Sequence, residues 1–201
     1  GYATTDGTAE PGLVLDNVAL VDSGKTLVVG KGKTKDADAF WTDPYLLVTN
    51  GASLTIQYFK ALEGTTLAGS SEGTLRRFGH VLVDDGTLTA TSEYFANSSD
   101  KWNFMVHQFR NGARLLTPSY RFTGSAASNV FDNATLAKNA ALDPMTFNQY
   151  DNKLVQLYFR DGAVLHNDSF SGNADRHTST TYYLNFDGAT WDLGPSTVSY
   201  T

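Results

Sequence analysis

The chain alternates short runs of apolar and β-branched residues with clusters of Asn, Asp and Gly. Segments such as "SLTIQYF", "TLTATSEYF", "KLVQLYF" and "TYYLNF" combine β-branched and aromatic residues with much period-two alternation. That pattern is typical of strands that turn one face toward a core. The sequence therefore predicts an all-β protein.

A turn motif recurs between these runs, most clearly in "FRNGARLL", which begins at Phe109, and in "FRDGAVLH", which begins at Phe159. Its common form is an apolar residue, then Asp or Asn, Gly, a small residue and another apolar residue; Asn133 replaces one glycine. Asn-Gly and Asp-Gly pairs favour positive φ and predict tight hairpins between apolar runs. We expect such turns at residues 50–51, 85–86, 111–112 and 161–162.

The turn positions, counted from Gly24 to Gly188, follow one another at intervals of 21 to 35 residues. This spacing favours an antiparallel β-sandwich or jelly roll with many Asn/Asp-Gly turns. The alternative is a β-solenoid, in which each interval is one coil. The one helix candidate is Ala134 to Leu142, capped by Asn133 and ended by Pro144.

Length, net charge and the apolar runs argue against some classes of protein, such as nucleic-acid-binding and membrane-spanning proteins. The chain has 201 residues and a net charge of -6, the wrong sign for tracking phosphates, so nucleic acid is not an expected partner. Apolar runs are of strand length, far from the roughly 20 residues of a membrane span. Because there is no cysteine, stability must come from packing and hydrogen bonds.

The sequence predicts a polar N-terminal arm, residues 1–12, followed by a single β domain, residues 13–201. The arm is short of core residues and closes with Pro11 and Gly12. A start at Gly1 without Met favours a processed, secreted protein. We therefore expect an extracellular, cell-surface or virion protein.

Catalytic chemistry has little support in the sequence, which assigns no catalytic residue. The four histidines lack the spacing of paired metal ligands, and there is no Gly-x-Ser-x-Gly elbow. Glutamate is scarce, and Glu93 is the one that falls firmly in an expected strand. In "FMVHQFR", alternation places His107 and Phe109 on one face and Gln108 and Arg110 on the other, so the group does not converge.

The sequence contains two candidate ligand sites. Asp36, Asp38 and Asp43 in "KDADAFWTD" form the best metal candidate, a calcium loop, although a solvated acidic loop is favoured over it. A stacking platform for a polysaccharide is the second, and core packing explains its aromatic residues as readily. Its candidate residues are Trp41, Trp102, Trp191, Tyr182 and Tyr183.

The leading functional hypothesis is a structural protein, a self-assembling subunit of a filament, surface layer or virion particle. Its partner would be another copy of the chain, joined head to tail through the apolar segment "LVLDNVALV" by strand addition. The assembly residues would be Leu13, Val14, Leu15, Val18 and Leu20. The alternative is a carbohydrate-binding module, or a lyase or glycoside hydrolase on a β-sandwich.

Overall fold

The structure is a computed structural model. It describes residues 12–29, 45–61, 77–97, 103–122, 127–149, 154–172 and 181–193. In these ranges the chain forms strands joined by turns, which confirms the all-β character. No helix in the described ranges has the length and apolar character needed to span a membrane.

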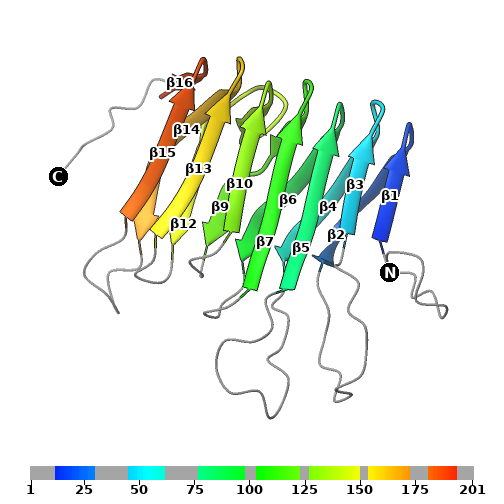
Figure 1. Cartoon of the computed structure of the whole chain (residues 1–201). Coiled ribbons are helices and arrows are strands. Elements are labelled where there is room, and N and C mark those ends of the chain that lie inside the picture. The colour runs from blue at the N-terminus through cyan, green and yellow to red at the C-terminus, as the bar shows by residue number, and fades with distance from the viewer. Residues whose placement is uncertain are drawn as a thin grey trace, which may run out of the picture.

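The strands form two sheets that face each other (Figure 1). The first sheet contains, in order, β1 (Gly12–Asp16), β3 (Tyr45–Thr49), β5 (Arg77–Asp84), β7 (Asn103–Arg110), β10 (Ala127–Asp132), β13 (Leu154–Arg160) and β15 (Thr181–Asp187). The second sheet contains β2 (Ala19–Val29), β4 (Ser53–Ala61), β6 (Thr87–Asn97), β8 (Arg114–Leu116), β9 (Ser119–Phe122), β11 (Thr135–Ala137), β12 (Met145–Gln149), β14 (Val164–Gly172) and β16 (Thr190–Asp192).

Every pair of neighbouring strands in the described ranges is parallel, so the antiparallel sandwich or jelly roll is wrong. Each strand of the first sheet leads through a turn into a strand of the second sheet, and the chain then returns to the first. One such pass is called a coil here. The described ranges form seven coils, which stack side by side (Figure 1). The path winds like that of a solenoid.

The Asn-Gly and Asp-Gly turns lie between strands as predicted, but they do not form hairpins. Each joins two strands that face each other across the core and pair with other coils instead of with one another. Turns of this kind are called arches here. The sequence specifies positive φ at a turn but not where the flanking strands find their hydrogen bonds, which is why the hairpin interpretation failed.

Aromatic ladders fill the core between the sheets. In the first sheet Phe109, Phe131, Phe159 and Phe186 stack in register with ring centroids 4.9 Å apart. The second sheet contributes a facing ladder, in which Phe59 stacks on Tyr94 at 4.4 Å and the series continues through Tyr120, Phe147 and Phe170. Parallel in-register pairing places equivalent residues of successive coils side by side, so the core extends along the whole stack.

The arches are of two lengths, which alternate from coil to coil. Three residues separate the strands in the long arches at 50–52, 111–113 and 161–163. Two residues separate them in the short arches at 17–18, 85–86, 133–134 and 188–189. Both central residues of the Asn-Gly or Asp-Gly pair have positive φ in the long arches, as expected. In the short arch at 85–86 only Asp85 does.

Two sequence predictions about turns are wrong. The expected helix after Asn133 is absent: that asparagine is an arch residue with φ of 47°, followed at once by β11. Gly24 is not a turn glycine, because it lies within β2, at an irregularity where the register of β2 against β4 shifts between Asp22 and Thr26. In both segments tertiary pairing overrides local preference.

Candidate functional site

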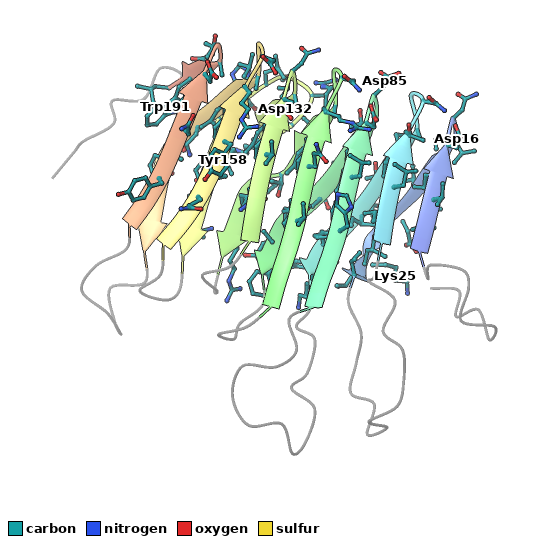
Figure 2. The ribbon with its side chains drawn as sticks, in the orientation of Figure 1. Asp16, Lys25, Asp85, Asp132, Tyr158 and Trp191 are labelled. Atoms are coloured by element: carbon teal, nitrogen blue, oxygen red, sulfur yellow. The ribbon has the colours of Figure 1, made fainter. Side chains whose placement is uncertain are left out.

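A row of alternating charge runs along the arch end of the first sheet. Its members are the last residues of the seven first-sheet strands, and we call it the arch-edge row: Asp16, Thr49, Asp84, Arg110, Asp132, Arg160 and Asp187. An aspartate precedes every short arch, and a threonine or arginine precedes every long arch. Figure 2 shows Asp16 and Asp132 at this end of their strands.

Within the row, Asp84 forms an ion pair with its neighbour Arg110. Arg110 Nε donates to Asp84 Oδ2 at 2.8 Å, and Arg110 Nη2 lies 2.6 Å from the same oxygen. Asn111 Nδ2 donates to Asp84 Oδ1 at 2.7 Å. Burial alone would raise the pKa of Asp84, but the bonds from Asn111 and Arg110 and the arginine charge outweigh it and hold that pKa below its usual 3.8. Asp84 and Arg110 thus form an ion pair between neighbouring members of the row.

The two end coils present strand edges that pair with no strand in the described ranges. At the first end, β1 pairs only with β3 and β2 only with β4. Val14, Val18, Leu20 and Val21 are exposed there, at 56%, 49%, 41% and 68%. Exposed strand edges lined with apolar residues are templates for pairing with another chain.

At the other end, β15 and β16 form the last coil (Figure 1). Leu184, Phe186, Ala189 and Trp191 point toward the core from this coil but are only partly buried. The Trp191 ring stacks on Phe186 with centroids 5.6 Å apart. The core therefore remains accessible at this end.

The edge strand β2 is irregular away from the arch. Asp22 and Thr26 are four residues apart in β2, but their partners in β4 are only two residues apart. Lys25 lies within this bulge and is exposed (Figure 2). Bulges and lysines on edge strands discourage further pairing. The register of β2 is therefore regular in two parts, Ala19 to Asp22 next to the arch and Thr26 to Val29 beyond the bulge.

A buried polar cluster lies between the sheets in the middle coils. The Tyr94 hydroxyl and His107 Nδ1 are 2.6 Å apart, and His107 Nε2 lies 2.7 Å from the Ala96 carbonyl oxygen. Since a carbonyl only accepts, Nε2–H is the donor and Nδ1 accepts from Tyr94. In the next coil the Tyr120 hydroxyl donates to Asn129 Oδ1 at 2.6 Å.

Burial governs the electrostatics of this cluster. It lowers the pKa of His107 to about 4, against the bond to Ala96, which raises it. It also raises the pKa of Tyr94 well above its usual value. His107, Tyr94 and Tyr120 are each fully buried. The cluster is therefore a neutral, hydrogen-bonded part of the core, out of reach of a substrate in this structure.

The structure places few of the predicted ligand residues. Asp36, Asp38, Asp43, Trp41 and Trp102 lie outside the described residues. Within the described part of the chain no group of three or more metal-binding side chains gathers.

The remaining aromatic candidates, Trp191, Tyr182 and Tyr183, belong to the last coil. The Trp191 side chain packs against the core, whereas Tyr183 is 61% exposed on β15. These two do not share a face. Tyr182 lies in β15, and its side chain is not among those described.

The predicted assembly residues all belong to the first coil. "LVLDNVALV" is not one strand: Asn17, with φ of 50°, divides it into β1 and the start of β2. Leu15 is buried, Leu13 is partly buried, and Val14, Val18 and Leu20 are exposed. The segment pairs with β3 and β4 of its own chain.

Sequence reasoning missed the arch-edge row and the first arch. The signal for the arch was present, because "LDNVAL" at Leu15 to Leu20 matches "FDNATL" at Phe131 to Leu136. The glycine of "VDSGKTL" suggested a turn at Gly24 instead. The row itself could be recognised only once the coils were aligned in parallel register.

Comparisons with protein-family models, with curated proteins and with solved structures found no match to this chain.

Proposed function

We propose that the protein is an extracellular or virion structural protein whose stack of coils is extended by a second copy of the chain, last coil against first coil. The observation that carries the proposal is that the inward-facing rows of residues at one end continue those at the other end. Continued in register, the first sheet would place Leu184 against Leu13 and Phe186 against Leu15 of the next copy. Both pairs would prolong rows that are apolar or buried within the stack.

The second sheet supports the same arrangement. Continued in register, Trp191 would lie against Leu20 of the next copy, in the row that holds Leu54 and Leu165. The strand β16 is only three residues long, so it needs no partner beyond the arch-proximal part of β2, and the bulge around Lys25 lies outside the contact. A head-to-tail contact that does not close on itself generates a filament.

The test places a charge inside the proposed contact. Leu20→Lys changes a residue that is 41% exposed, so folding should be little affected. Leu142→Lys is the matched control, since Leu142 is 39% exposed in the turn between β11 and β12, away from both ends. Sedimentation velocity and electron microscopy at about 1 M NaCl, where charge is screened, report assembly.

We expect the wild type and Leu142→Lys to form linear assemblies as concentration rises, and Leu20→Lys to stay monomeric. A wild type that remains monomeric at the highest soluble concentration would overturn the proposal, and so would equal assembly by both variants. Circular dichroism of each variant confirms that the fold is retained.

A further inference from the structure

The two ends of the stack carry the same kind of arch. Short and long arches alternate, and both the first coil, with Asn17, and the last coil, with Gly188, have the short kind. Both are preceded by an aspartate of the arch-edge row, Asp16 and Asp187. Everywhere within the stack, an aspartate of this row has threonine or arginine in the neighbouring coils.

Joining two copies head to tail breaks this alternation. The register that places Phe186 against Leu15 also places Asp187 against Asp16 of the next copy. Strand spacing in a sheet is about 4.8 Å, so the two carboxylates would be close neighbours. Like charges directly opposite each other on neighbouring strands are destabilising.

The surroundings of the two carboxylates do not offset this repulsion. Asn50 Nδ2 donates to Asp16 Oδ1 at 2.8 Å, and the row neighbour of Asp16 is the uncharged Thr49. Arg160 is the row neighbour of Asp187 in its own chain. The junction would thus hold two aspartates with one arginine, whereas within the stack Asp132 has an arginine on each side.

Hydrogen bonding of the arches shows the same mismatch. The turn glycine of each long arch donates to the short arch of the next coil, as Gly51 N does to Asp85 O at 2.6 Å and Gly112 N to Asn133 O at 2.7 Å. A short arch has one residue fewer. The short arch at Gly188 therefore has no equivalent glycine N–H to offer Asn17 O of another copy.

We propose that Asp16 and Asp187 form a like-charge barrier between copies, so that a single charge reversal at the arch-edge row promotes head-to-tail assembly. This inference rests on the proposed function, and its partner is a second copy of the chain. Asp16→Arg is the sharpest variant, because it restores alternation across the junction. The row would then continue from Arg160 through Asp187 to the introduced arginine and on to Thr49, with no like charges adjacent in either chain.

The experiment compares assembly of the full chain at low salt and at about 1 M NaCl by sedimentation velocity. At low salt Asp16→Arg should lower the concentration needed for assembly about tenfold, because an exposed repulsion becomes an exposed attraction. The difference from wild type should largely vanish at about 1 M NaCl. Asp143→Arg makes the same change of net charge at an exposed position away from both ends, and should not reproduce the shift.

A second variant separates the pair from net charge. Adding Asp187→Arg to Asp16→Arg places two arginines at the junction and should abolish the gain. If Asp16→Arg matches Asp143→Arg while Leu20→Lys still blocks assembly, the barrier is rejected and the proposed function stands. If no variant assembles at either salt concentration, both proposals fail.

Discussion

Gly86 shows how closely neighbouring arches approach each other. A Cβ added there would lie 3.0 Å from Val48 O, 3.0 Å from Val48 Cγ1 and 3.1 Å from Ala52 O. Two of these atoms, Val48 O and Ala52 O, are backbone atoms of the adjacent coil. Glycine is therefore required here by space, not by positive φ.

We predict that Gly86→Ala destabilises the fold by about 1–3 kcal/mol, the usual range for overpacking. Gly24→Ala is the control, since a Cβ there would meet nothing within 4 Å and φ is not positive. Urea unfolding of both variants measures the difference. Equal free energies of unfolding for the two variants would show that neighbouring arches can move apart without destabilising the fold.

His107 makes the free energy of unfolding depend on pH. Its pKa in the folded protein, about 4, lies below its ordinary 6.5, so the unfolded chain binds more protons between these values. Stability therefore falls as pH decreases through that window. From pH 7 to pH 5 the free energy of unfolding should fall by about 2 kcal/mol, because this change crosses the part of the window between the ordinary pKa of 6.5 and pH 5.

His107→Gln should abolish this part of the pH dependence, although the variant is less stable at pH 7. Urea unfolding at pH 5, 6 and 7 checks the difference in slope. Asp84 does not contribute to the slope between pH 5 and pH 7, because its pKa lies below 3.8. An unchanged slope in the variant would show that His107 is not the group responsible.

At the scale of the element, the two residues that precede an arch have different structural roles. The phenylalanine before the arch enters the core ladder, and the next residue enters the arch-edge row, as in "FRNG" and "FRDG". Because these positions recur in register, each coil that has this phenylalanine adds one ring to the ladder and one residue to the row. The motif is a unit of stacking as well as a turn.

The Asp84–Arg110 pair tests the row at this scale. We predict a favourable coupling of at most about 1 kcal/mol in a double-mutant cycle of Asp84→Asn and Arg110→Gln, because the arginine side chain is 40% exposed. The coupling should shrink in high salt. A coupling free energy near zero at low salt would show that the Asp84–Arg110 pair does not stabilise the fold.

The sequence specified the turns and the strands but not the pairing of the strands. Asn50, Asn111 and Asp161 adopt the positive φ that the Asx-Gly motif predicts. Parallel pairing was missed because the segments between coils vary in length and obscure the repeat, although phenylalanine precedes four of the arches. The buried cluster was beyond prediction, since alternation put His107 inside but nothing local indicated Tyr94 as its partner.

At the scale of the whole molecule, each described coil is held by its neighbours. A middle coil such as the one containing β7 is paired on both sides, whereas the coils with β1 and β15 are paired on one side. Stability in such stacks is approximately a sum of coil and interface terms, so protection should be uneven.

We predict that amide hydrogens of β5, β7 and β10 exchange most slowly and those of β1 and β15 fastest. Native-state hydrogen exchange with mass spectrometry resolves these strands. Uniform protection from end to end would indicate that the stack opens only as one cooperative unit.

The alternation of long and short arches has a consequence for how such a protein changes in length. The described coils are odd in number, and an odd alternating series begins and ends with the same member. Duplication or loss of two adjacent coils preserves this parity and leaves the ends alike. Duplication of a single long-arch coil at either end makes the ends unlike, with an aspartate facing outward on one side and an arginine or threonine on the other. One added coil would thus remove the like-charge contact from the head-to-tail junction and favour assembly at lower concentration.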